Sequence, residues 1–310
     1  MRALLTGASS FTGLWFAEKL HAAGAEIVAP LRHRPESYKE MRALRVRRLS
    51  DIAEIVPGCS FGDDRFLGLV NEVSFDVLCH HAAEVGNYRS PDFDVVSAVT
   101  RNTNNLGGVL ERMGERGLKA VVATGSVFEQ DEGGGDRPLR AFSPYGLSKG
   151  LTWQVIRYWC MSIGLPAFKF VIANPFGPFE EPRFCAYLIK TWRLGGTAEV
   201  RTPLYVRDNI HVDLLALTYA RFVHAVVQGD AVPHFGPCGY IETQGEFTER
   251  VAAALRPRLG YDCRIKMIDQ KDFPEPRMRI NSDAIEPASY GWEEAAAWDA
   301  LAEFYGSVGL

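Results

Sequence analysis

The sequence predicts an α/β protein built on a doubly wound parallel sheet, followed by a smaller and irregular second lobe. Short apolar segments alternate with amphipathic ones over the first 175 residues, and this alternation is typical of a parallel sheet with helices on both faces. The first apolar segment runs into a turn of small residues. With 310 residues, 47% of them hydrophobic, the chain can bury one large core or two fused lobes.

Five apolar segments are expected to form the strands of the sheet: Ala3–Thr6, Glu26–Pro30, Val77–His80, Ala120–Thr124 and Ala167–Ile172. The amphipathic segments between them are expected to be helices near 14–23, 64–73, 101–116 and 145–163. Ligands of such sheets bind beyond the carboxyl ends of the strands. We therefore expect the polar residues that follow the strands to surround one crevice.

The turn after the first strand has the composition of a dinucleotide-binding site. Gly7 lets the backbone turn sharply, while Ser9 and Ser10 leave room for a diphosphate. Gly13 allows the following helix to lie close to the strand, and the N–H groups at the start of that helix favour phosphate. The sequence thus predicts a Rossmann fold whose cofactor-binding turn comprises Gly7, Ser9, Ser10, Phe11 and Gly13.

After residue 175 the chain is interrupted repeatedly by proline, from Pro178 to Pro287. We expect residues 1–175 to form the dinucleotide-binding domain with the catalytic groups, and residues 176–310 to form mainly a substrate-binding lobe. One further strand near Val232–Phe235 is expected to return to the main sheet.

Composition narrows the class of protein. The formal net charge of −4 and the pI near 6.0 argue against a nucleic-acid partner. The basic segment Arg42–Arg48 is expected to be a solvated helix face. No apolar run approaches the roughly 20 residues that cross a bilayer, and the N-terminus enters a core strand at once, so we expect a cytoplasmic protein without a membrane partner. The six cysteines include no C-x-x-C pair, so no metal is expected.

Tyr145 and Lys149 carry the strongest chemical signal. Residues four apart share a helix face, so these two present a phenol and an ammonium group together. A nearby cation favours phenolate and lowers the pKa of a tyrosine. We therefore predict a proton-transferring tyrosine whose pKa is lowered by Lys149.

Seven groups of residues occur in the order found in the extended short-chain dehydrogenase/reductases. They are Thr6-Gly7 with Gly13, His81-Ala82-Ala83, Asn104 with Gly107, Thr124 with Val127-Phe128, Tyr145 with Lys149, Asn174-Pro175-Phe176-Gly177-Pro178, and Arg207-Asp208-Asn209-Ile210-His211-Val212-Asp213. Over residues 3 to about 285, the chain resembles the nucleotide-sugar epimerase, dehydratase and ketoreductase branch of that superfamily.

The resemblance implies roles for individual residues. Tyr145 is the general acid/base, Lys149 binds the nicotinamide ribose, and Thr124 holds the reacting oxygen, with Ser126 as the fallback on the substrate side. Asn104 steadies the active-site helix. The remaining cofactor contacts that it implies are His81, Ala82 and Ala83 beside the dinucleotide and Asp63 at the adenine.

Two departures from the family pattern bear on the cofactor. The second turn glycine is Ser10 here, which adds a side chain near the pyrophosphate. An NAD site carries an acidic residue after the second strand, whereas this chain has Arg32, followed by His33 and Arg34. A guanidinium suits a 2′-phosphate, so we predict NADP(H), with NAD(H) as the alternative.

On the substrate side, the resemblance implies that Asn174 and Arg207 bind the diphosphate of a nucleotide sugar, with Arg279 or Arg277 as a second cation. Sugar dehydratases carry an Asp-Glu pair after the active-site threonine, where this chain has Gly125 and Ser126, so dehydration is disfavoured.

The sequence therefore predicts NADPH-dependent reduction of a 4-keto, 6-deoxy nucleotide sugar by a homodimer that pairs through the helices near 101–116 and 145–163. Trp153, Tyr158 and Trp159 supply apolar area for that interface or for the core. Nucleotide-sugar 4-epimerisation is the alternative, and a non-catalytic dinucleotide sensor is the third reading.

Overall fold

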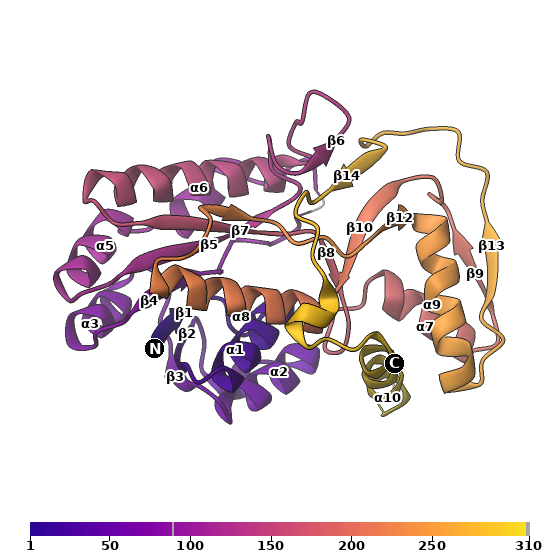
Figure 1. Ribbon diagram of the computed structural model, residues 1–310, viewed down its shortest axis with the longest axis horizontal. Helices are drawn as coiled ribbons and strands as arrows, with labels where there is room; N and C mark the ends of the chain where they lie inside the picture. Colours follow the sequence, from indigo (N-terminus) through magenta and orange to yellow (C-terminus); the bar gives the residue numbers. More distant parts are fainter. Residues whose placement is uncertain (89, 308–310) are drawn as a thin grey trace.

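The computed structural model describes residues 1–88 and 90–307, and its larger part is a seven-stranded parallel sheet (Figure 1). The strands lie in the order β11-β7-β5-β4-β1-β2-β3. Their bounds are Arg2–Leu5 (β1), Glu26–Leu31 (β2), Glu54–Pro57 (β3), Val77–His80 (β4), Ala120–Ser126 (β5), Ala167–Ile172 (β7) and His234–Phe235 (β11). The doubly wound sheet and its five predicted strands are confirmed. The short edge strand β3, which ends in proline, was not predicted.

Helices cover both faces of this sheet. One face packs against α1 (Phe11–Ala22), α2 (Glu40–Ser50) and α8 (Val212–Gln228), and the other against α3 (Asp64–Glu72), α5 (Leu106–Glu115) and α6 (Pro144–Ser162). A further helix, α4 (Val95–Asn102), packs on α6. Strand side chains alternate between the two faces, so Leu4 and Leu5 enter different cores. The helix expected at 101–116 is interrupted because Asn105 adopts the left-handed conformation, with φ of 49°.

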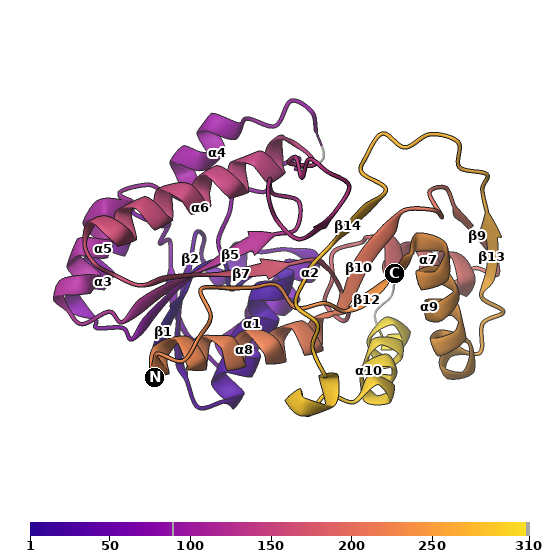
Figure 2. The same cartoon turned by 45° about the horizontal axis from the view of Figure 1, so that its top comes forward.

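The smaller lobe lies beside the carboxyl ends of β5 and β7 (Figure 2). Its main sheet has the order β12-β10-β14-β6, with β8 beside β10, and a second sheet pairs β13 with β9. The strands are β6 (Gly134–Gly135), β8 (Asn174–Phe176), β9 (Thr197–Val200), β10 (Val206–His211), β12 (Tyr240–Thr243), β13 (Arg264–Met267) and β14 (Met278–Ile280). Three helices surround them: α7 (Phe184–Arg193), α9 (Gln244–Leu259) and α10 (Glu294–Ser307).

The chain crosses between the two parts more than once. Residue 175 falls inside β8, which belongs to the smaller lobe. Later, α8 packs on α1 and β11 pairs with β7, so both return to the larger part. In the opposite direction, β6 leaves the first 175 residues to pair with β14. Residues 308–310 of the predicted second lobe lie outside the described residues.

Candidate active site

The turn between β1 and α1 is packed too tightly for side chains at two positions. Gly7 has φ of 71°, and a Cβ there would lie 2.9 Å from the Cα of Ala82. A Cβ on Gly13 would overlap the carbonyl oxygen of Gly7. Thr6 binds the segment that follows β4, because its hydroxyl accepts hydrogen bonds from the amides of His81 at 3.1 Å and Ala82 at 3.0 Å. The turn and the segment after β4 therefore form one surface at the start of α1.

Ser10, the departure from the family pattern, is the N-cap of α1. Its Oγ accepts a hydrogen bond from the Gly13 amide at 3.1 Å and lies 3.1 Å from Nε2 of His81. The same ring nitrogen lies 3.0 Å from the hydroxyl of Thr12. Burial lowers the pKa of His81 to about 3, and the ammonium of Lys149 acts in the same direction. His81 is thus a neutral ring that binds the turn through hydroxyl groups.

Two arginines of α2 reach the turn, although the sequence predicted a solvated helix face there. Arg42 donates to Oγ of Ser9 from Nε at 3.2 Å and from Nη2 at 3.0 Å. Arg45 is only 2% exposed, and it donates to the carbonyl oxygen of Ser9 at 3.1 Å and to that of Phe179 at 2.8 Å. It also forms an ion pair with Glu181. The prediction of a solvated face is wrong for Arg45, because two carbonyl groups and a carboxylate replace its water.

Arg32 and Asp63, both predicted to bind the cofactor, already have protein partners. Arg32 lies at the end of β2, exposed, with its Nη1 3.8 Å from Oε2 of Glu84. Asp63 is the N-cap of α3, and its two carboxylate oxygens accept from the amides of Ser60 and Phe66, each at 2.8 Å. Its structural role is to start a helix, and the adenine contact stays a prediction.

Tyr145 and Lys149 lie in the first turns of α6, which Ser143 caps by accepting from the Gly146 amide at 3.3 Å. The ring of Tyr145 is half-buried between those of Tyr88 and Phe93, with centroid distances of 5.7 and 5.9 Å. Lys149 is 7% exposed and donates to the carbonyl oxygen of Thr124 at 2.5 Å.

The pKa shifts of this pair differ from the prediction. Burial raises the pKa of Tyr145 to about 12, the carboxylate of Glu129 adds to the increase, and Arg183 opposes it. Burial lowers the pKa of Lys149 to about 8, with Glu129 opposing. The expected lowering of the Tyr145 pKa by Lys149 is wrong in this structure, since burial dominates and the ammonium group is directed at the carbonyl of Thr124.

The two predicted hydroxyl groups at the end of β5 differ in their environment. Thr124 is 5% exposed and lies next to Tyr219, and its Oγ1 has no hydrogen-bond partner among the described residues. Ser126 is half-buried, and its Oγ accepts from the amide of Phe128 at 3.2 Å. The hydroxyl of Thr124 is therefore buried beside the phenol of Tyr219, whereas that of Ser126 is bonded within its own turn.

The helix-steadying role predicted for Asn104 belongs to Asn102. Asn102 is 5% exposed, and its Nδ2 donates to the hydroxyl of Thr152 on α6 at 3.1 Å. Its Oδ1 accepts from the amide of Glu84 at 2.7 Å. Asn104 donates instead to the carbonyl of Phe61 at 3.3 Å. The difference arises because α4, which packs against α6, ends at Asn102, so Asn104 lies beyond that helix.

The predicted diphosphate contacts lie in the smaller lobe. Asn174 donates to the carbonyl of Asp208 at 3.2 Å. Arg207 is 8% exposed, with its Nη2 3.0 Å from Oε2 of Glu275 and its guanidinium 4.4 Å from the ring centre of Tyr205. Arg279 is fully buried. Its position corrects the expectation of an open site, because its guanidinium binds main-chain carbonyls instead of facing a crevice.

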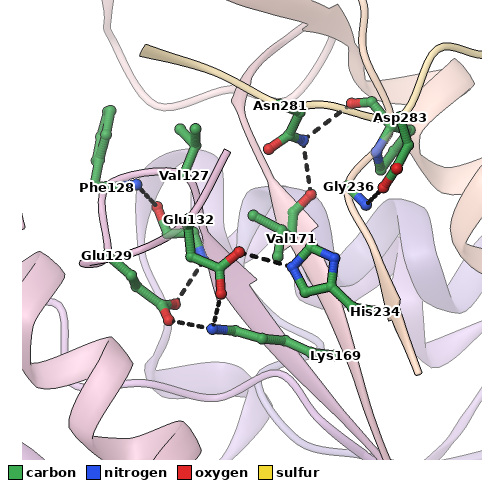
Figure 3. A network of polar contacts seen from close by, with 12 residues as sticks. Val127, Phe128, Glu129, Glu132, Lys169, Val171, His234, Gly236, Asn281 and Asp283 are labelled. Atoms are coloured by element: carbon green, nitrogen blue, oxygen red, sulfur yellow. Dashed lines mark hydrogen bonds and ion pairs between the residues drawn. The ribbon is translucent and has the colours of Figure 1, made fainter. Parts of the chain in front are cut away.

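Several functional candidates were missed by the sequence reasoning. Arg183 lies over the ring of Tyr88, with 5.8 Å between its Cζ and the ring centre, and so brings a cation toward Tyr145. Glu129, Glu132 and Lys169 form a buried charged cluster next to the end of β5 (Figure 3). A signal for the cluster did exist: Lys169 is a lone charge in an apolar strand, and a buried lysine requires partners.

The described part of the chain contains neither a metal-binding cluster nor a membrane-spanning helix. Over residues 1–88 and 90–307, no three side chains of histidine, cysteine, aspartate or glutamate are arranged to hold a metal ion. Within the same residues, no helix has the length and apolar character needed to cross a membrane.

The chain combines a glycine-tight turn after β1 with Tyr145 and Lys149 on α6, which is the pattern of the extended short-chain dehydrogenase/reductase class. The family model described as NAD dependent epimerase/dehydratase matches residues 3–235. The chain belongs to this family and is an enzyme that uses a nicotinamide dinucleotide. No curated protein matches the chain.

Solved structures share the fold over nearly the whole chain. Pal from Bacillus thuringiensis is 17% identical with a TM-score of 0.75, and UDP-glucose 4-epimerase from Thermotoga maritima, solved with UDP-glucose, is 18% identical with a TM-score of 0.73. In both cases 99% of each chain is covered. The dTDP-glucose 4,6-dehydratase DesIV from Streptomyces venezuelae, solved with NAD and TYD, is 20% identical with a TM-score of 0.70, over 99% of this chain and 97% of that one.

Proposed function

We propose that this enzyme uses NADPH to reduce a 4-keto, 6-deoxy nucleotide sugar to the corresponding alcohol. The observation that carries the proposal is the group formed by Tyr145, Lys149 and Thr124 at the carboxyl end of β5. Tyr145 donates its phenolic proton to the carbonyl oxygen of the sugar, and the hydroxyl of Thr124, which lies beside Tyr219, donates a hydrogen bond to the same oxygen once the substrate is bound. A reduced nicotinamide supplies the hydride when it is bound.

Packing around Gly125 supports reduction over dehydration. A Cβ at this position would lie 2.5 Å from Cε of Lys169 and 3.2 Å from Oε1 of Glu129. An aspartate, which dehydratases of the family carry there, would therefore need the buried ion pair to move. The nearest carboxylate, Glu129, is 0% exposed and bonded to Lys169, so it is withheld from a substrate.

We propose NADP(H) as the cofactor, because two arginines flank the place where the ribose of the adenosine would lie. Arg32 follows β2, and Arg42 binds the hydroxyl of Ser9 in the turn after β1. The close backbone approach at Gly7 and Gly13 supports a bound diphosphate at this turn. NAD(H) is the alternative, and the solved relatives named above include a dehydratase with NAD.

Dissociation constants of NADPH and NADH test the cofactor assignment. We expect Arg42→Ala and Arg32→Ala each to weaken NADPH binding roughly tenfold to a hundredfold, as for a lost hydrogen bond to a charged group, and to leave NADH binding unchanged. Arg47→Ala is the matched control, since Arg47 is exposed on the same helix as Arg42. A wild-type preference for NADH would reject the assignment.

For the substrate diphosphate we propose Asn174 and Arg207, with Arg183 as an additional cation on the side of Tyr145. Arg279 could contribute only after releasing its two main-chain carbonyls, whereas the alternative residue, Arg277, is exposed. A guanidinium binds a diphosphate through paired hydrogen bonds. The likeness to enzymes solved with UDP-glucose and TYD supports a nucleotide-diphosphate ligand.

Epimerisation at C4 is the second candidate, favoured by the matching family and by the likeness to a UDP-glucose 4-epimerase. The two reactions differ in their redox balance. Net oxidation of NADPH with a 4-keto-6-deoxy nucleotide sugar is expected for the reductase. Interconversion of ordinary nucleotide hexoses without net oxidation would instead establish the epimerase.

Catalysis itself is tested by Tyr145→Phe. Loss of a general acid typically costs 10²- to 10⁴-fold in rate, so we expect kcat to fall by about that factor while the dissociation constant of NADPH stays within about twofold. Unchanged turnover of the true substrate would show that Tyr145 is not the proton donor, and would favour the reading as a dinucleotide sensor.

We also propose that the enzyme is a cytoplasmic homodimer. The outer side of α4 and α6 exposes apolar side chains, including Val96 at 76%, Tyr158 at 67% and Met161 at 72%. Trp153, by contrast, packs against the core, and Trp159 packs on Gly107. Sedimentation equilibrium of wild type and Tyr158→Asp tests this, and a wild-type monomer would reject it.

A further inference from the structure

Four titratable side chains form a continuous chain of contacts from the interior to the surface (Figure 3). Nζ of Lys169 lies 2.6 Å from Oε2 of Glu129 and also pairs with Glu132. Oε2 of Glu132 lies 2.7 Å from Nε2 of His234. Glu129 is 0% exposed and Lys169 3%, whereas 44% of the His234 side chain is exposed. The mechanism proposed above gives this cluster no part.

The inner end of the cluster folds the turn that follows β5. Oε1 of Glu129 accepts from the amide of Ser126 at 2.7 Å, and the amide of Glu129 donates to the carbonyl of Ser126 at 3.0 Å. A Cβ on Gly146 would overlap the carbonyl oxygen of Phe128. The turn is therefore in direct contact with α6 at the residue next to Tyr145.

The smaller lobe holds the same turn from the other side. Nε of Arg279 donates to the carbonyl of Val127 at 2.8 Å, and its Nη2 donates to the carbonyl of Glu129. Because Arg279 is fully buried, these bonds form away from water. The turn carrying Glu129 is thus fixed by β5, α6 and β14 together.

We propose that Glu129 is a positioning residue of the active site, which locks the turn at residues 126–132 against α6 and keeps a buried negative charge beside Tyr145 and Lys149. The catalytic consequence of this role rests on the function proposed above, whereas the effect of Glu129 on Tyr145 and Lys149 does not. The charged and titratable groups that face Glu129 are Lys169 on β7, Glu132 on the same turn, Tyr145 and Lys149 on α6, and Arg279 on β14.

Glu129 and Glu132 form a matched pair for testing this proposal. Both bind Lys169, but Glu129 alone of the two raises the pKa of Tyr145 and that of Lys149. Glutamine at either position keeps the size of the side chain and one of its two hydrogen-bonding oxygens while removing its charge. A charge effect on the active site therefore follows Glu129→Gln and not Glu132→Gln, whereas a general loosening of the cluster follows both.

The test is an NMR titration of Lys149 in protein with ¹³C-labelled lysine, assigned with Lys149→Arg. In the wild type, burial lowers the pKa of Lys149 to about 8. We expect Glu129→Gln to lower it by on the order of one unit, as for removal of a nearby opposite charge, and Glu132→Gln to leave it unchanged. Equal pKa values in wild type and Glu129→Gln, or equal shifts in both variants, would overturn the proposal.

The pH dependence of kcat/KM gives the second readout. Reduction needs a protonated Tyr145, so activity falls at high pH, and Glu129→Gln is expected to move that fall to lower pH. If Glu129→Gln does not fold, the double variant with Lys169→Met removes both charges; Lys169 does not contribute to the Tyr145 shift, so the fall moves in the same direction. A fall at the wild-type pH overturns the proposal. Failure of the function itself shows separately, as full activity of Tyr145→Phe.

Discussion

The turns after β1 and after β5 lie at the same edge of the sheet but are held in opposite ways. The first, at residues 7–13, is held by the absence of side chains at Gly7 and Gly13 and by the hydroxyl of Ser10. The second, at residues 126–132, is held by the buried charges of Glu129 and Lys169. One turn leaves backbone N–H groups free of side chains, and the other brings buried charge near α6, which carries Tyr145 and Lys149.

This difference suits the two turns to the different roles proposed for them above. A turn without side chains suits a ligand that supplies its own charge, such as a diphosphate. A turn stabilised by a buried ion pair resists distortion, because breaking the pair leaves a charge without solvent or partner. Under the function proposed above, the second turn therefore keeps Thr124 and α6 in fixed positions relative to each other during turnover.

The largest effect is expected from breaking the second turn with Lys169→Met. Two carboxylates then lose their buried cation, and removal of one partner from such a cluster costs about 3–5 kcal/mol. Urea unfolding measures the loss of stability. Adding Glu129→Gln and Glu132→Gln to the same chain should restore most of it, since no buried charge is then unpaired. A loss below about 1 kcal/mol in the single variant would show that the cluster is not structural.

A smaller effect is expected in the first turn, from Gly13→Ala. The added methyl group overlaps the carbonyl of Gly7, and overpacking of this kind costs about 1–3 kcal/mol. We expect weaker NADPH binding as well, because the turn must open. Gly68→Ala on α3 is the control: nothing lies within 4 Å of a Cβ there, so it should stabilise the helix by about 0.5–1 kcal/mol. Equal effects at both glycines would refute the packing argument.

The smallest effect is expected at the exposed end of the charged cluster that holds the second turn, from His234→Gln. The hydrogen bond to Glu132 raises the pKa of His234. Burial by itself would raise the pKa of Glu132, but the contacts with His234 and Lys169 lower that pKa overall. The pair therefore stabilises the fold fully below the ordinary histidine pKa of 6.5 and above the ordinary glutamate pKa of 4.5. This contribution is lost as the pH rises through the raised pKa of His234, or falls through the lowered pKa of Glu132.

Free energies of unfolding at several pH values test this sign. Because His234 is half-exposed, the difference between wild type and His234→Gln should stay below about 1 kcal/mol. It should be largest between about pH 5 and 6.5 and become small at alkaline pH. A difference that grows toward alkaline pH would contradict the ion pair.

The sequence predicted features that depend on residues close together in the chain better than features that depend on contacts between distant residues. The turn at Gly7 and Gly13 was predictable because its chemistry lies within a few residues. The basic segment at 42–48 was misread, because a local pattern gives no sign that Arg45 meets the carbonyl of Phe179 far along the chain. The direction of the Tyr145 pKa shift was also missed, since burial between Tyr88 and Phe93 outweighs the neighbouring ammonium group.

By itself, the sequence determined the parallel sheet, the dinucleotide turn and the pairing of Tyr145 with Lys149 on one helix. These depend on the periodicity of side chains and on backbone freedom, both of which are local. Only the tertiary structure decided which charges are buried together, such as Glu129 with Lys169, and which arginines serve the main chain instead of a ligand. Electrostatic effects depend on distance through space and on exclusion of water, and neither is set until the chain has folded.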